Sequence, residues 1–368
     1  MAKRLPTRTA VALALGAAAV WAARDLPAQI GAKARGARRA RMEASPQFSG
    51  GKFRNTVPAT EVAAASMPRL FVAAMTDRDA RRPHLPVPVV TPAPAAATTD
   101  GLHVTWYGHS SALVEIEGRR VLLDPVWSDR CSPSRLTGPR RLHEPPVPLR
   151  ELPPLDAIVI SHDHYDHLDM VSIQNLVDLQ AAPFLVPLGV GAHLERWGVP
   201  ESRIVELDWH ESHKIGGLEL IATPARHFSG RGLNRDETLW ASWVIKGSTR
   251  KAFYSGDTGY FPGFAEIGAE HGPFDVTLVQ VGAYGDAWPD IHMFPEDGVA
   301  VHADVRGGLM IPVHWATFNL ALHDWSEPAD RTWREAKARG VRLAIPRPGE
   351  RVDVDNPPPV DGWWQQIA

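Results

Sequence analysis

The stretch that most constrains this chain is Ser161-His162-Asp163-His164-Tyr165-Asp166-His167, which follows the apolar run 155–160. A β-branched apolar run of that length is typical of a buried strand. Imidazole nitrogens and carboxylate oxygens both bind divalent ions such as zinc, at about 2.0–2.2 Å. Because side chains on a strand alternate with a period of two, His162 and His164 point the same way and can bind one ion. Asp166 and His167 follow where the chain turns towards a helix, and they are predicted to face a second ion.

Three more strand-like runs are each followed by one residue of a type that binds metals. Residues 218–226 precede His227, residues 251–256 precede Asp257, and residues 309–313 precede His314. Each of these taken alone is equally well explained as a buried, hydrogen-bonded histidine or as an aspartate that caps a turn. The repetition of one arrangement favours a shared metal site over a solvated, histidine-rich loop without a metal.

The order of these residues resembles the signature of the metallo-β-lactamase superfamily, which is His-x-His-x-Asp-His followed by His, Asp and His. The resemblance implies a four-layer αββα sandwich of the α/β class, in which two mixed sheets are flanked by helices and the metals lie at one edge. It also implies two Zn²⁺ ions per chain. The implied ligands are His162, His164 and His227 for the first ion, Asp166, His167 and His314 for the second, and Asp257 as a bridge between them.

Within that superfamily the chain resembles the N-acylphosphatidylethanolamine-hydrolysing phospholipase D family. The matching stretches extend from about residue 101 to about residue 349 and include 104–109, 122–130, 138–141, 205–209, 256–260, 281–284 and 314–318. Residues 51–55 also resemble the lead-in segment of that family. Two features depart from the family pattern: Asp163 stands where asparagine is common, and residues 285–291 depart from the expected pattern of aromatic and basic residues.

The resemblance assigns chemical roles to a few residues beyond the ligands. Asp166 and His292 are the catalytic candidates, and His292 would position or protonate the leaving group of the substrate. Asp124 is expected to hydrogen-bond within the ligand loop and to orient an imidazole, although a turn aspartate before Pro125 is an equal alternative. The remaining histidines, His109 and His323 among them, are predicted to be structural or exposed.

These assignments lead to three hypotheses about function. The first is a zinc phosphodiesterase of the phospholipase D type, which would release N-acylethanolamine and phosphatidic acid from a phospholipid. The second is a lactonase or small-ester hydrolase that uses the same metals, and it is motivated by the unusual residues 285–291. The third is a non-catalytic, membrane-associated binding protein on a hydrolase scaffold, which the complete ligand set argues against.

Charge is distributed unevenly along the 368 residues, whose net charge is −3. Up to Asn55 there are eleven Lys or Arg residues and two acidic residues, so the rest of the chain carries −12. An anionic membrane surface is the simplest partner for such a basic segment, at about 1 kcal/mol per basic residue held near it. No nucleic-acid-binding motif accompanies the charge, so nucleic acid is not expected as a partner. The single cysteine, Cys131, excludes a disulfide within the chain.

The apolar run 9–23 lies inside this basic segment and is too short to span a bilayer comfortably. A cleaved signal peptide or a membrane anchor is therefore expected, so the protein would be exported or membrane-associated, and an Ala-rich soluble helix is the alternative. The predicted organisation is a signal or anchor segment at 1–45, a lead-in segment and a proline- and alanine-rich strap at 46–100, and the hydrolase domain at 101–368.

Periodicity predicts most of the elements of that domain. Strands are expected at 102–106, 112–116 and 120–123, and the last two are joined by a turn at Glu117-Gly118. Helical periodicity is found at 170–179, 190–197, 264–270, 295–305 and 329–339.

Overall fold

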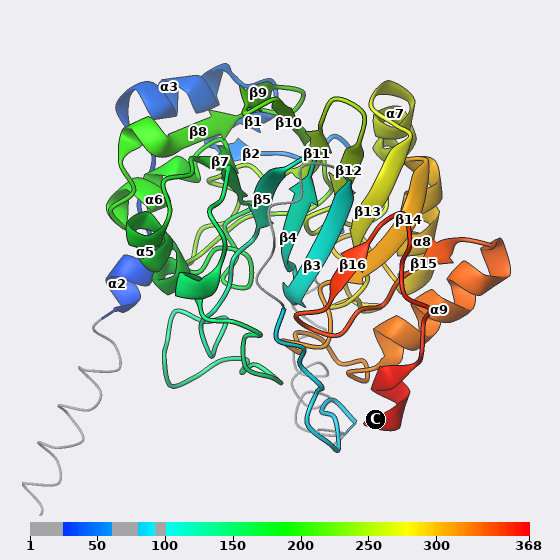
Figure 1. Cartoon of the computed structure of the whole chain (residues 1–368). Coiled ribbons are helices and arrows are strands. Elements are labelled where there is room, and N and C mark those ends of the chain that lie inside the picture. Colours follow the sequence, from blue (N-terminus) through cyan, green and yellow to red (C-terminus); the bar gives the residue numbers. More distant parts are fainter. Residues whose placement is uncertain (1–24, 61–79, 93–100) are drawn as a thin grey trace, which may run out of the picture.

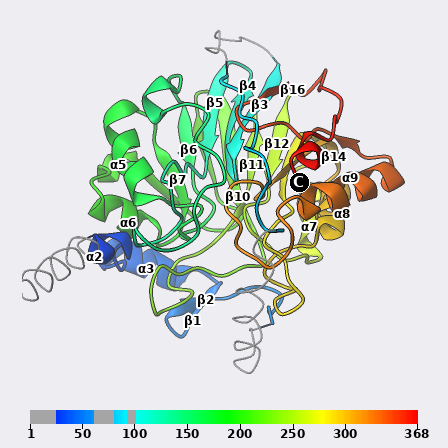
Figure 2. The ribbon, with the colours of Figure 1, turned by 90° about the horizontal axis from the view of Figure 1, so that it is seen from below.

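Two seven-stranded sheets pack face to face at the centre of the molecule (Figure 1). The structure is a computed structural model, which describes residues 25–60, 80–92 and 101–368. Helices cover the outer faces of both sheets, and the view from below shows the same layers (Figure 2). This arrangement is the four-layer αββα sandwich with mixed sheets that the sequence predicted.

The first sheet is antiparallel on one side and parallel on the other. Its strands, in spatial order, are β16 (Arg351–Asp353), β3 (Leu102–Gly108), β4 (Ser111–Ile116), β5 (Arg119–Leu123), β6 (Ala157–Val159), β7 (Phe184–Pro187) and β8 (Ile204–Leu207). The antiparallel strands β3, β4 and β5 form the predicted meander. The parallel strands β5 to β8 need longer connections, and these connections carry the ligand loop and the helices of this side.

The second sheet repeats this division into a parallel and an antiparallel part. Its strands, in spatial order, are β15 (Arg342–Leu343), β14 (Gly307–Val313), β13 (Phe274–Gln280), β12 (Lys251–Tyr254), β11 (Ser242–Lys246), β10 (Leu218–Thr223) and β9 (Ser212–Ile215). Because β12 and β14 run in the same direction, the residues that follow them leave the sheet at the same edge. That edge is where the sequence places Asp257 and His314.

Helices lie on the outer faces at the positions that periodicity predicted, within three residues at each end. Helices α5 (Met170–Leu179) and α6 (Gly191–Arg196) cover the first sheet, and α7 (Gly263–Glu270), α8 (Pro295–Asp304) and α9 (Glu327–Arg339) cover the second. The side chain of Asp169 accepts hydrogen bonds from two backbone N–H groups of the first turn of α5, which fixes the start of that helix. Gly340 ends α9 in the left-handed conformation, at φ 68°. Short 3₁₀ turns lie at η2 (Leu149–Glu151), η3 (Glu201–Arg203) and η4 (Trp363–Gln366).

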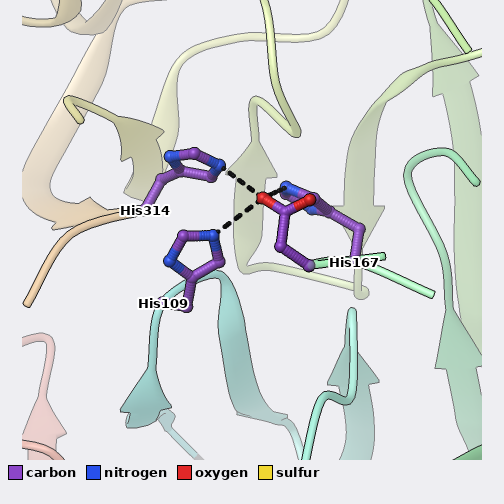
Figure 3. Close-up of side chains that lie close together, drawn as sticks. His109, His167 and His314 are labelled. Atoms are coloured by element: carbon purple, nitrogen blue, oxygen red, sulfur yellow. Dashed lines mark hydrogen bonds and ion pairs between the residues drawn. The ribbon is translucent and has the colours of Figure 1, made fainter. Parts of the chain in front are cut away.

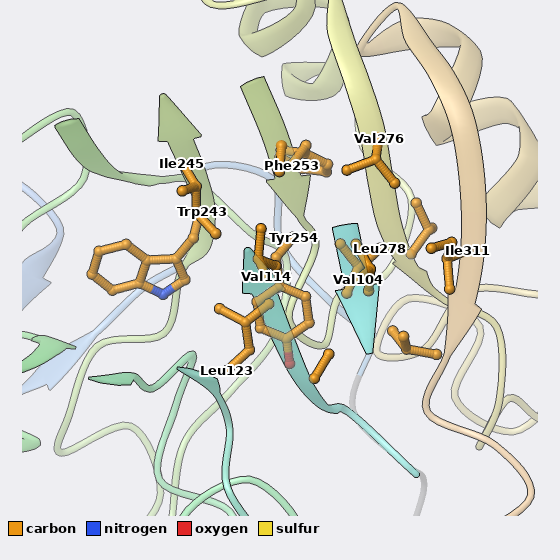
Figure 4. Packing of buried hydrophobic residues seen from close by; sticks show 14 of the residues in the cluster. Val104, Val114, Leu123, Trp243, Ile245, Phe253, Tyr254, Val276, Leu278 and Ile311 are labelled. Carbon is orange, nitrogen blue, oxygen red and sulfur yellow. The ribbon is translucent and has the colours of Figure 1, made fainter. Parts of the chain in front are cut away.

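Strand β4 shows why these strands are apolar on both faces. Ala112, Val114 and Ile116 point into the main core between the two sheets, where they meet residues of the second sheet such as Phe253 (Figure 4). Leu113 points the other way, into a second cluster beneath α5 and α6. Because both faces of the sheet are covered, a strict alternation of apolar and polar residues is not required.

The N-terminal segment packs along the first sheet through α2 (Leu26–Gln29), α3 (Gly36–Ala44) and the small strands β1 (Phe48–Ser49) and β2 (Lys52–Phe53). Phe53 is only 2% exposed and belongs to the main core. Arg38 pairs with Glu206 and Glu195 at 2.5 and 2.7 Å, and Arg41 contacts Glu211 at 2.5 Å. Some of the basic residues of the N-terminal segment therefore form ion pairs with acidic residues of the rest of the chain.

The predicted signal or anchor at 9–23 lies outside the described residues. Among the residues that are described, no helix is both long and apolar enough to cross a bilayer. The domain boundaries and the membrane association stay predictions.

Candidate metal centre

Four loops that follow strand ends bring all seven predicted ligands into one cluster. The loop after β6 carries residues 162–167, and the loops after β10, β12 and β14 carry His227, Asp257 and His314. Strand β10 ends at Thr223, before Pro224, because proline has no N–H for the ladder. Asp257 is 3% exposed, and the buried histidines of the cluster are less so. Asp166, at 9%, and the partly buried His164 are more exposed, so the cluster is shielded from bulk water over most but not all of its surface.

The first ligand group consists of His162, His164 and His227. The Nδ1 atom of His164 lies 2.8 Å from Nε2 of His162 and 3.3 Å from Nε2 of His227. The Oδ2 atom of Asp257 lies 3.9 Å from Nε2 of His227. Three imidazoles that converge with their nitrogens this close can share one cation.

The second ligand group consists of Asp166, His167 and His314, together with the same oxygen of Asp257. The Nε2 atoms of the two histidines lie 3.0–3.3 Å from Oδ2 of both carboxylates. Figure 3 shows imidazoles from three segments directed at one carboxylate. Ligands at about 2.0–2.2 Å around a tetrahedral zinc ion are separated by about 3.3–3.6 Å, which is close to these distances. Asp257 Oδ2 faces both groups and lies between them.

Hydrogen bonds on the outer ring nitrogens determine which nitrogen of each imidazole faces the cluster. A proton on the outer nitrogen leaves a lone pair on the inner one, which a metal requires. The outer hydrogen bonds run from His162 Nδ1 to Ser161 Oγ at 2.9 Å, from His167 Nδ1 to Asp124 Oδ2 at 2.6 Å, and from His227 Nδ1 to Ile291 O at 3.0 Å. Two ligands are exceptions: the Nδ1 of His164 faces the cluster, and the outer Nδ1 of His314 has no hydrogen-bond partner.

Asp124 lies fully buried behind the ligand loop, where the sequence placed it. Its Oδ2 accepts hydrogen bonds from Ser161 Oγ at 2.5 Å, His167 Nδ1 at 2.6 Å and the Tyr254 hydroxyl at 2.5 Å, and its Oδ1 accepts one from Ser161 N at 2.7 Å. Burial and the neighbouring Asp124 raise the pKa of Tyr254 well above its usual range, so the hydroxyl remains a donor. Four donors thus fix one carboxylate and, through it, the orientation of His167.

The two ligand groups differ electrostatically. Burial holds the pKa of His162 and His227 well below the usual value, so these imidazoles are neutral at pH 7. Burial also lowers the pKa of His314, but Asp257 and Asp166 outweigh it and raise that pKa to about 9. Burial opposes ionisation of Asp257, yet His167 and His314 hold its pKa well below the usual range. The second group therefore attracts positive charge strongly.

Unpartnered polar atoms support the presence of metal ions in the functional protein. Three atoms of the cluster, His167 Nε2, Asp257 Oδ1 and His292 Nδ1, are buried without a hydrogen-bond partner. Buried polar atoms are rarely left unpaired, and a cation supplies the missing interaction for an imidazole nitrogen or a carboxylate oxygen. A mixed nitrogen and oxygen donor set without sulfur is one that zinc accepts. The residues present therefore fit a pair of divalent ions.

His292 lies at the edge of the cluster, and its side chain is 16% exposed. Its Nδ1 is 3.7 Å from Asp257 Oδ2, and its ring centroid is 5.1 Å from that of His227 and 5.3 Å from that of His314. Burial lowers the pKa of His292 to about 3, so the ring is neutral and donates from one nitrogen. The structure thus brings His292 beside the ligands, on the side that opens to solvent.

His109 is a member of the cluster that the sequence reasoning left out. The sequence predicts a structural or exposed residue, and the structure shows a buried one: its Nε2 lies 2.9 Å from Asp166 Oδ2, and its backbone oxygen accepts a hydrogen bond from His314 N at 2.8 Å. The available signal was the same as for the ligands, because His109 directly follows a strand, β3. His323 also forms a hydrogen bond within the fold: its Nε2 accepts from Ala283 N at 3.0 Å.

Comparison with known proteins agrees with this geometry. The Beta-lactamase superfamily domain matches residues 119–315, which is more than half of the chain. The chain belongs to this metallo-β-lactamase superfamily. The matching region contains all seven predicted ligands but neither β3 nor the N-terminal segment.

Curated relatives of this superfamily member include proteins with and without a described activity. An uncharacterised protein of Mycobacterium tuberculosis is 51% identical over 97% of this chain and 99% of its own length. The N-acyl-phosphatidylethanolamine-hydrolyzing phospholipase D 1 of Caenorhabditis elegans is 36% identical over 63% of this chain and 68% of its own length. Among solved structures, the metallo hydrolase Igni18 of Ignicoccus hospitalis has a TM-score of 0.52 at 21% identity, and it covers 68% of this chain and 97% of its own. That likeness confirms the fold.

Proposed function

We propose that this metal-dependent hydrolase is a dinuclear zinc phosphodiesterase of the phospholipase D type, which cleaves N-acylphosphatidylethanolamine-like lipids. The observation that carries the proposal is the coincidence of a complete nitrogen and oxygen ligand set with similarity to two relatives named for this activity. Besides the nematode relative, a yeast protein named N-acyl-phosphatidylethanolamine-hydrolyzing phospholipase D is 30% identical over 62% of this chain and 50% of its own length.

His162, His164, His227 and Asp257 would hold one zinc ion, and Asp166, His167, His314 and Asp257 would hold the other. Two divalent ions bound there would supply a nucleophilic water at neutral pH and would compensate negative charge on phosphorus. In the proposed reaction, water oxygen forms a bond to phosphorus and the bond from phosphorus to the N-acylethanolamine oxygen breaks. That oxygen takes up a proton, which leaves N-acylethanolamine and phosphatidic acid.

The chain contributes orientation and charge placement to this reaction. Asp166 and Asp257 stay ionised because the neighbouring histidines lower their pKa values, so both remain available as ligands. The neutral ring of His292 can donate one hydrogen bond to an oxygen of the substrate at the open side of the cluster. Basic residues of the N-terminal segment would hold the protein near an anionic membrane surface, where such a lipid resides.

A mass-spectrometric assay on zinc-loaded protein tests the proposal. The panel holds N-acylphosphatidylethanolamine in vesicles and soluble lactones, because residues 285–291 depart from the pattern of the phospholipase D family and a lactonase is the second candidate. Release of N-acylethanolamine and phosphatidic acid, absent after chelation and restored by zinc, is the expected result. Faster turnover of lactones than of the lipid would favour the second candidate, and no turnover of either class would favour a binding role.

A further inference from the structure

We propose that Asn55 is a positioning residue for the first ligand group, because it fixes the backbone of His227 from a segment outside the matching family region. The inference rests on the proposed metal centre and adds to it a residue that does not touch the metal. Asn55 lies 172 positions from His227 in sequence.

Two hydrogen bonds join the Asn55 side chain to the backbone of His227. Asn55 Nδ2 donates to His227 O at 2.8 Å, and His227 N donates to Asn55 Oδ1 at 3.0 Å. An amide is the side chain that can donate and accept in this way while remaining uncharged. Asn55 therefore pairs with His227 much as a residue of a neighbouring strand would.

His227 needs such a partner because regular structure stops before it. Strand β10 ends at Thr223, and only an isolated bridge between Arg226 and Gly259 follows. The ring of His227 is held at Nδ1 by Ile291 O. With the backbone fixed by Asn55 and the ring fixed by Ile291, the direction of Nε2 towards the first group is determined.

The segment that carries Asn55 is itself anchored on both sides. On one side Phe53 is buried in the main core, and its N–H donates to Asp236 O at 2.8 Å. On the other side the guanidinium of Arg226 donates to Pro58 O. The indole of Trp240 donates to Asn55 Oδ1 at 3.1 Å, which orients the amide. The position of Asn55 is thus determined before any metal binds.

The effects of substitution follow from the two hydrogen bonds. Asn55→Ala removes both. Asn55→Asp keeps an acceptor for His227 N–H but directs a second carboxylate oxygen at His227 O, where two acceptors repel. Thr56→Ala is the matched control, because Thr56 is the neighbouring residue and is exposed.

The test is a zinc titration against a competing chelator, with metal content per chain and thermal unfolding measured on the same samples of full-length protein. Both Asn55 variants should weaken one of two zinc equivalents by 10- to 100-fold, the range known for residues that orient ligands. Thr56→Ala should bind like the wild type. In a His227→Ala background, Asn55→Ala should cause no further loss, because its effect passes through His227.

Two results would overturn the inference alone: wild-type zinc affinity at both sites in Asn55→Ala, or a further loss of affinity in the His227→Ala background. The first would show that His227 is positioned without Asn55, and the second that Asn55 acts through the general fold. A wild-type chain that binds fewer than two ions would instead refute the proposed dinuclear centre, and with it the inference.

Discussion

Replacement of Asp124 by asparagine tests whether a single buried carboxylate determines the tautomer of a metal ligand. Asp124 Oδ2 receives three hydrogen bonds, and its Oδ1 receives the N–H of Ser161 at 2.7 Å. Asparagine has nearly the same shape and also tolerates the positive φ of 36° at this position. The change therefore alters the donors and acceptors with little change in volume.

Neither orientation of the new amide can replace the carboxylate. If the amide oxygen takes the place of Oδ2, the NH₂ group faces the Ser161 N–H, and two donors oppose each other. If the NH₂ group takes the place of Oδ2, it donates to His167 Nδ1, which moves the ring proton to Nε2. A protonated Nε2 has no lone pair for a metal, so the second ligand group loses a donor.

A 10- to 100-fold loss of zinc affinity at one site is expected, which corresponds to about 1.4–2.7 kcal/mol. Tyr254→Phe is the matched control, since it removes one donor to Asp124 without changing the proton on His167. That variant should lose about 1.5–3 kcal/mol of unfolding free energy but retain both zinc ions. The assay is chelator-competition titration together with urea unfolding of each variant.

Wild-type zinc affinity in Asp124→Asn would refute the tautomer argument. So would an equal loss of affinity in Tyr254→Phe, because the packing around Asp124, and not the proton on His167, would then be responsible.

Three other predictions concern the rim of the site and the fold. His292→Ala should keep two zinc ions while its turnover falls about 100-fold. Asp257→Asn should lose both metal and turnover. Metal analysis and a lipid-hydrolysis assay on both variants check these outcomes. Burial alone would raise the pKa of Glu117, but hydrogen bonds from Ser248 and Thr249 hold this pKa at about 2, below the usual 4.5. The wild type should therefore have a higher free energy of unfolding than Glu117→Gln, as measured by urea unfolding. This difference should be complete above about pH 4.5 and should shrink as the pH falls towards 2. Leu123→Ala should cost about 2–5 kcal/mol in the same assay, against about 0.5 or less for Leu179→Ala, because Leu123 is fully buried and Leu179 is 42% exposed.

Much of the metal centre was accessible from sequence because its signals are local. His162 to His167 form a compact spacing pattern, and His227, Asp257 and His314 each follow an apolar run. Helix α5 was predicted with its observed bounds, because the spacing of its apolar residues marks the buried face within one short segment.

Other parts were not accessible because their meaning depends on distant contacts. Asn55 is not a metal-binding type of residue, and only the fold brings it to His227. His109 carries the strand-then-histidine signal, but a single sequence does not separate it from a core histidine. Strands such as β7 and β11 were not predicted, since no ligand follows them and their apolar runs have no distinct period.

The pairing of β16 with β3 has a consequence for synthesis of the protein. Arg351 pairs with Thr105, so β3 must wait for a partner that is translated about 250 residues later. At 5–20 residues per second the delay is roughly 12–50 s, during which one edge of the nascent first sheet has no strand partner. Until its last strand leaves the ribosome, the emerging polypeptide therefore presents a strand edge on which wrong pairing can start.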